Sequence, residues 1–135
     1  RDWSSDVCSS DLLTFARGTV LSARFARDSG TIVYSAAWDA QAPQLYSTRP
    51  EGSESRALSI SNADVLSISS TGEMALLAKP GSVLEWGWKA GTLSRAALAG
   101  GALREMQGGV LLADWGPDPS RLAIVRATSA GSRVE

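Results

Sequence analysis

Three stretches of the chain align with one another, and a repeat of this length restricts the folds open to it. They are residues 22–34, 66–76 and 113–125. Each begins with a large apolar residue, here called the anchor, and continues through a polar tight turn into an apolar run. The anchors are Phe25, Ile68 and Trp115, so the repeat lengths are 68 − 25 = 43 and 115 − 68 = 47 residues.

The turn after each anchor has residues suited to closing it. Asp28 and Asp118 can accept hydrogen bonds from the backbone just ahead of them. Gly30 and Gly72 can adopt the positive φ that such turns often require. The anchor is then expected to fill the space between adjacent sheets. The apolar run after the turn is expected to form a central strand that neighbouring sheets cover on both faces.

Four strand patterns fit into one repeat. Beyond the two strands around the turn, further alternating or apolar runs occupy residues 44–48, 56–60, 91–98 and 102–106. Residues 93–105 are rich in Ala and Leu, but Ala99-Gly100-Gly101 interrupts them and favours a hairpin over a helix. Repeats of about 40–45 residues with four strands are typical of β-propeller blades. We therefore predict an all-β, incomplete β-propeller of about two and a half four-stranded antiparallel blades.

The predicted segments begin after a short foreign stretch. Asp2 to Leu12, DWSSDVCSSDL, resembles the translation of a common sequencing adapter, so residues 1–12 are excluded as an adapter-derived, disordered artefact. The alternative is a natural Ser/Asp-rich linker. The first blade is predicted over 13–64, the second over 65–109, and part of a third over 110–135. The chain is expected to be a fragment of a longer protein.

The repeat resembles a known family. FARDSGTIVY at 25–34 and DWGPDPSRLAIV at 114–125 are similar to the FSPDGxxIVY signature of the WD40-like repeats called PD40, found in TolB. Residues 15–135 as a whole are similar to propellers at the C-terminal end of bacterial serine/threonine protein kinases. The turns depart from the signature, with Ala26-Arg27 in place of Ser-Pro, Ser69-Ser70-Thr71 in the second repeat, and Pro119 where Gly is usual.

Several kinds of chemistry lack their residues. The sequence has no His, and its one cysteine, Cys8, lies in the excluded stretch. Ser-His-Asp and Cys-His catalysis and the usual zinc sites are therefore ruled out, and neither a GxSxG elbow nor a GxxxxGK[ST] phosphate loop occurs. We predict no catalytic, cofactor-binding or metal-binding residues and no enzymatic activity in this fragment.

Charge and hydropathy narrow the partners. Without residues 1–12, basic residues fall from 13 to 12 and acidic residues from 14 to 11, so the net charge is 12 − 11 = +1. A near-neutral chain has no electrostatic footprint for nucleic acid, and no apolar run approaches the roughly 18 residues of a membrane span. The expected partners are a protein or small ligand at one propeller face, and the missing blades of the same chain.

Three residues are candidates for partner binding. Asp114 precedes the anchor Trp115, on the innermost strand that would line a central channel. Its alternative role, shared with the other aspartates, is to cap turns and strand ends. Trp86 and Trp88 are two residues apart and would share one face of a strand. Exposed tryptophans often mark binding surfaces, but these two can equally pack between blades.

The resemblance implies a binding or sensor module of a signalling protein, a serine/threonine kinase whose catalytic domain lies elsewhere. Two alternatives are the gating propeller of a prolyl-oligopeptidase-type peptidase and a TolB-like periplasmic scaffold. The sequence does not place the compartment, and a membrane-anchored kinase or a TolB-like parent would put the module outside the cytoplasm. The sequence features that separate these parents lie in flanking domains.

The repeat count leads to a first prediction. A propeller closes with roughly four to eight blades, so residues 13–135 alone should leave the strands at 32–34 and 122–125 partly exposed. We expect this fragment to be marginally stable or aggregation-prone, as size-exclusion chromatography and thermal unfolding would show. A monomer that melts cooperatively above about 60 °C, beyond the mesophilic range, would contradict the open propeller.

Overall fold

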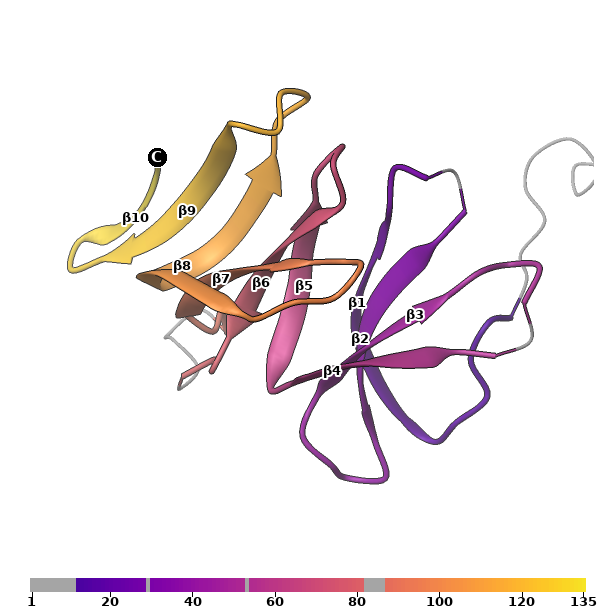
Figure 1. Ribbon diagram of the computed structural model, residues 1–135. Coiled ribbons are helices and arrows are strands. Elements are labelled where there is room, and N and C mark those ends of the chain that lie inside the picture. Colours follow the sequence, from indigo (N-terminus) through magenta and orange to yellow (C-terminus); the bar gives the residue numbers. More distant parts are fainter. Residues whose placement is uncertain (1–11, 29, 53, 82–86) are drawn as a thin grey trace, which may run out of the picture.

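Ten strands in two antiparallel sheets make up the regular structure of this computed structural model, which describes residues 12–28, 30–52, 54–81 and 87–135. The first sheet has the order β1-β2-β3-β4, and the second has the order β10-β9-β8-β7-β6-β5. Figure 1 shows the sheets side by side, with β1 next to β5. The strands are β1 (Gly18–Phe25), β2 (Ile32–Trp38), β3 (Gln44–Thr48), β4 (Arg56–Ser61), β5 (Ala63–Ile68), β6 (Glu73–Ala78), β7 (Gly91–Ala97), β8 (Arg104–Trp115), β9 (Leu122–Thr128) and β10 (Gly131–Val134).

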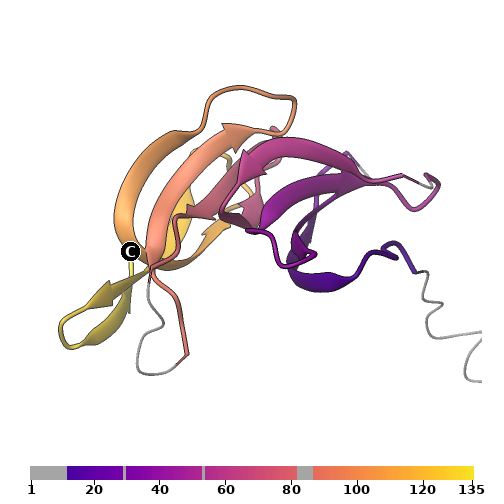
Figure 2. The same cartoon turned by 90° about the horizontal axis from the view of Figure 1, so that it is seen from below.

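The strand β8 belongs to two blades at once. Its first half pairs with β7, where Leu93 lies opposite Gln107, and its second half pairs with β9, where Asp114 lies opposite Ala123. The six-stranded sheet is therefore the second blade joined edge to edge to a partial third. Figure 2, seen from below, shows the curvature that this long strand gives the sheet.

The first blade meets the second at a sharper junction. Between β4 and β5 only Asn62 intervenes, with a φ of 53°, and its N–H donates to the carbonyl of Pro43 at 2.6 Å. The outermost strand of one blade thus leads directly into the innermost strand of the next. The chain is all-β and forms part of a β-propeller, as predicted, and residues 93–105 form the expected hairpin. The precise blade boundaries stay a prediction. The described part contains no helix able to cross a membrane.

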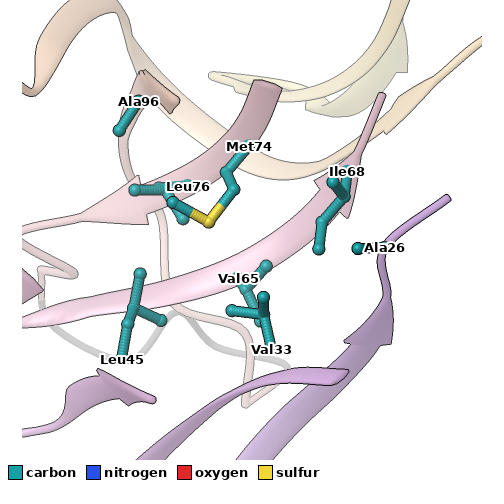
Figure 3. Close-up of a cluster of buried hydrophobic side chains, with 8 residues drawn as sticks. All are labelled: Ala26, Val33, Leu45, Val65, Ile68, Met74, Leu76 and Ala96. Carbon is teal, nitrogen blue, oxygen red and sulfur yellow. The ribbon is translucent and has the colours of Figure 1, made fainter. Parts of the chain in front are cut away.

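One apolar cluster holds the first blade against the second (Figure 3). Ile68 and Val65 of β5 lie between the two sheets, with Val33 of β2 and Leu45 of β3 on the side of the first blade. Burying a side chain of this size contributes roughly 1.5–3 kcal/mol. The cluster consists of Ala26, Val33, Leu45, Val65, Ile68, Met74, Leu76 and Ala96.

A second cluster repeats this arrangement between the second and third blades. Trp115 is only 8 % exposed and shares the cluster with Leu77 and Leu93 of the second blade. The guanidinium of Arg95 lies 5.2 Å from the centre of the Trp115 ring, a distance at which a cation is attracted to the ring face. Ile68 and Trp115 therefore fill the gap to the preceding sheet, as anchors were expected to do.

Phe25 does not follow the other two anchors. It is 70 % exposed, because no sheet of the described chain precedes β1. The prediction that Phe25 fills a gap between sheets is therefore wrong for this chain. Its counterparts Ile68 and Trp115 show which way it points: toward the position of a preceding blade.

The two central strands at the open faces differ from the prediction. β9 stays partly exposed, as expected for a strand that lacks a following blade. In β2, however, Val33 and Tyr34 are buried, so the expected exposure of residues 32–34 is wrong. The ring of Tyr34 stacks on Tyr46 with 5.4 Å between centroids and meets Trp38 edge-on. These aromatic side chains cover the peripheral half of the first blade's outer face.

A β-bulge reveals the structural repeat more regularly than the anchors do. The pairing of each innermost strand shifts at a leucine that follows a valine: Val20-Leu21, Val65-Leu66 and Val110-Leu111. These valines are 65 − 20 = 45 and 110 − 65 = 45 residues apart. The anchor spacings differ because β5 has two residues fewer between its bulge and its turn. Losing two residues preserves which side chains face the core, since side chains alternate with a period of two.

Replacing one buried residue between the blades tests this packing. Leu76→Ala should lower the free energy of unfolding by about 2–5 kcal/mol, because the cavity left between two rigid sheets cannot collapse. Leu103→Ala, on the exposed hairpin, is the matched control and should change it by no more than about 0.5 kcal/mol. Urea unfolding followed by tryptophan fluorescence measures both. Equal effects would contradict an inter-blade core at Leu76.

Candidate binding groove between the first two blades

The structure places Asp114 on the innermost strand, as predicted, and shows what its carboxylate contacts. The hydroxyl of Ser67 donates to Asp114 Oδ1 at 2.7 Å, and the N–H of Trp115 donates to Ser67 Oγ at 3.0 Å. Asp114 thereby links the second blade to the third. Its carboxylate is exposed but engaged in holding two blades together.

A similar polar link, which the sequence reasoning missed, joins the first two blades. Asp64 accepts hydrogen bonds from the hydroxyls of Ser22 and Ser35, and Arg24 Nε donates to the carbonyl of Leu66 at 2.7 Å. The sequence carried a signal for this link. Ser22 and Ser67 both follow the Val-Leu bulge, and each donates to an aspartate of the next blade.

The two tryptophans are not brought together by the described structure. Trp88 is 50 % exposed and lies in an irregular segment before Lys89. Trp86 lies outside the described residues. The predicted shared strand face is therefore not observed, and packing of Trp88 between blades does not occur.

The turn residues behave as two groups. Asp28 accepts from the hydroxyl of Thr31 at 2.7 Å and from the backbone N–H groups of Thr31 and Gly30 at 3.0 and 3.3 Å. Asp118 accepts from the N–H of Ser120 at 2.9 Å. These aspartates close their turns as predicted.

Only one of the two turn glycines is required by backbone conformation. Gly72 has a φ of 82°, as expected, whereas Gly30 does not adopt a positive φ. The prediction for Gly30 is wrong because the side chain of Asp28 closes that turn instead. A Cβ at Gly30 would meet no atom within 4 Å, so the position does not require glycine.

The largest hollow that the described residues line is a groove of about 470 Å³ between the first two blades. It lies where the turns of both blades meet: the β1–β2 and β5–β6 turns and the β7–β8 hairpin. Its apolar side chains include Leu58, Ile60, Met74 and Leu98. Residues 28, 31, 47, 56–60, 71, 72, 74 and 97–101 line it.

Five consecutive residues of β4, Arg56–Ile60, line the groove. In the described structure β4 is the outermost strand of its sheet, so one edge of its backbone faces away from β3. Its pairing with β3 is irregular between Gln44 and Tyr46, and Ser59 has a φ of 59°. A non-glycine residue in this region costs of order 1–3 kcal/mol and often marks a functional segment.

Charge at the groove is balanced. Asp28 lies at one end, where Arg49 Nη2 contacts its Oδ2 at 3.0 Å, and the exposed Arg56 supplies a cation at the start of β4. Hydroxyls of Thr31, Ser47 and Thr71 add neutral polar groups. Across the described ranges no three His, Cys, Asp or Glu side chains gather in a way that would hold a metal ion. The groove has the makings of a binding surface, with apolar contacts, hydroxyls and an open strand edge.

Comparisons with known proteins identify the fold. No protein-family model matches the chain, and no curated protein sequence matches it. Among solved structures it is similar to the β-propeller domain of the Trilobed protease from Pyrococcus furiosus, described as having an open velcro topology, with a TM-score of 0.58 and 17 % identity. The match covers 83 % of this chain and 35 % of that one, so the chain spans about a third of that structure.

The pKa of Asp28 predicts how the groove end responds to acid. The hydroxyl of Thr31, then its N–H, the N–H of Gly30 and the charge of Arg49 lower this pKa from 3.8 to about 2. A carboxylate with a depressed folded-state pKa stabilises the fold above its ordinary pKa and loses that effect as the pH falls through about 2. Asp28→Asn should therefore be less stable than the original chain above about pH 4, with a difference that shrinks toward pH 2.

Urea midpoints of the two proteins between pH 2 and 6 measure this difference. A gap that stays constant across the range would show that Asp28 acts through shape and not through its charge.

Proposed function

We propose that this chain is a non-catalytic part of a β-propeller that binds an extended segment of a partner protein along β4. The observation that carries the proposal is the groove of about 470 Å³ that five consecutive residues of an edge strand line. Extended peptides commonly bind by adding a strand to an exposed sheet edge. Main-chain hydrogen bonds then give affinity, and alternate side chains enter neighbouring pockets.

The groove matches these requirements on each side. The apolar side chains of Leu58 and Met74 can receive every second side chain of the segment. Arg56 can pair with an acidic residue of the partner. This site differs from the residues singled out from the sequence, because the carboxylate of Asp114 already joins two blades through Ser67.

The reading as a binding module rests on the residues available for chemistry. The sequence has no His, and its carboxylates at Asp28, Asp64 and Asp114 accept hydrogen bonds that hold turns and blades. We infer that the fragment is no enzyme and that any catalysis belongs to another domain of its parent. The PD40-like signature favours a bacterial serine/threonine kinase parent, with the propeller as its sensor.

A second function is favoured by the structural comparison. The similar solved propeller is a domain of a protease, and a propeller attached to a peptidase can gate access to the hydrolase domain. A gating role would place the selective surface around the central channel instead of in the groove between blades. A TolB-like scaffold is the remaining alternative. Each parent differs in its flanking domains and in the compartment it would occupy.

A peptide titration tests binding along β4. The probe is the capped pentapeptide acetyl-Thr-Val-Glu-Val-Thr-amide, added to the ¹⁵N-labelled full chain. We expect saturable shifts of the amide signals of residues 57–60, Gly72 and Leu98. A version N-methylated at both valines cannot donate to the strand edge and should bind about tenfold more weakly, since each net hydrogen bond contributes roughly 0.5–1.5 kcal/mol.

Two matched variants assign the charge contact. Arg56→Gln should weaken the probe about threefold, within the range of exposed ion pairs. Arg104→Gln, which removes an exposed arginine outside the groove, should leave the affinity unchanged. Equal binding of the methylated probe, or shifts confined to the innermost strands, would reject strand addition and favour a channel-side or gating role.

A further inference from the structure

The inner half of the first blade's outer face is apolar and uncovered. Val20, Ala23 and Phe25 of β1 are all exposed there. Their structural counterparts are buried in both other blades. Val65 and Ile68 lie in the cluster between the first two blades, and Val110, Ala113 and Trp115 lie in the cluster between the second and third.

The equivalence rests on backbone pairing. Each anchor lies opposite the first residue of the next strand: Phe25 opposite Ile32, Ile68 opposite Met74, and Trp115 opposite Leu122. The N–H following each anchor closes the turn, from Ala26, Ser69 and Gly116. Phe25 is therefore positioned as Ile68 and Trp115 are, so it faces the place where a preceding sheet would pack.

The opposite end of the chain offers the complementary surface. The far face of the third blade has a hollow of about 390 Å³, which Leu112, Ala123 and Val125 help to line. Strand register makes Ala123 and Val125 the counterparts of Ala75 and Leu77, because Ala75 pairs beside the anchor partner Met74 as Ala123 does beside Leu122. Ala75 and Leu77 are the residues that share the buried cluster with Trp115.

We propose that two copies of this chain associate head to tail, with Phe25 of each copy seated in the hollow beside Leu112, Ala123 and Val125 of the other. The contact continues the interface already present twice within the chain: an anchor of one blade against the far face of the blade before it. Neither face carries a charged residue at these apolar positions, so no ion is desolvated by the contact.

Two copies suffice to close the arrangement. A head-to-tail contact forms a ring when its rotation closes and an open filament when it does not. Each copy supplies two blades and a partial third, so two copies supply six sheets, within the roughly four to eight blades of known propellers. The inference is independent of the β4 groove, which the first two blades of a single copy form.

Two substitutions, one on each face, test the contact. Phe25→Asp removes the head and Leu112→Asp removes the tail, at side chains that are 70 % and 39 % exposed in the single copy. Leu103→Asp, 38 % exposed and on the β7–β8 hairpin, is the matched control. Sedimentation velocity at about 50 µM full chain should give a dimer for the original chain and the control, and a monomer for each of the other variants. Circular dichroism at the same concentration checks that each variant is folded.

Mixing the two monomeric variants distinguishes head-to-tail from head-to-head contact. The Leu112→Asp copy keeps an intact head and the Phe25→Asp copy keeps an intact tail, so the mixture should regain a dimer with one working interface. A monomeric original chain, an unbounded series of larger species, a Leu112→Asp variant that remains dimeric, or a mixture that stays monomeric would each overturn the proposal.

Discussion

Each blade of this chain can bury its two faces only against another blade, and the rest of the structure depends on that constraint. A four-stranded sheet is too thin to hold a core of its own. The apolar clusters around Ile68 and Trp115 accordingly lie between sheets and not within one. The same constraint explains why residues of equal chemical character are buried in the second and third blades and exposed in the first.

Polar contacts at the inner ends set the direction in which the blades follow one another. Ser22 and Ser67 stand at corresponding places after the bulge and each donates to an aspartate of the next blade, Asp64 or Asp114. Because apolar packing is nondirectional, such bonds fix the relative position of neighbouring innermost strands. In the third blade Leu112 takes the place of these serines. The hydroxyl-to-carboxylate link therefore stops at the face whose uncovered side chains are apolar.

The repeat, the four-stranded blades and the hairpin at 93–105 were predictable because they depend on local alternation and on turn residues. What depends on neighbours was not. Tyr34 was expected to be exposed with its strand, yet Tyr46 and Trp38 cover it from the same sheet. The groove along β4 joins residues from three separate turns, so no single motif announces it. The Val-Leu bulge was visible in the sequence, but its regular 45-residue spacing gained meaning only once the strand pairing was known.

The shared strand β8 has a mechanical consequence. The second and third blades belong to one hydrogen-bonded ladder, so pulling them apart along the strand direction loads many backbone bonds in shear. The first and second blades are joined by a single residue of chain at Asn62 and by side chains, so the same force would peel their contacts open one after another. Under tension this chain should yield first at Asn62, and a parent protein that senses force would find its compliant joint there.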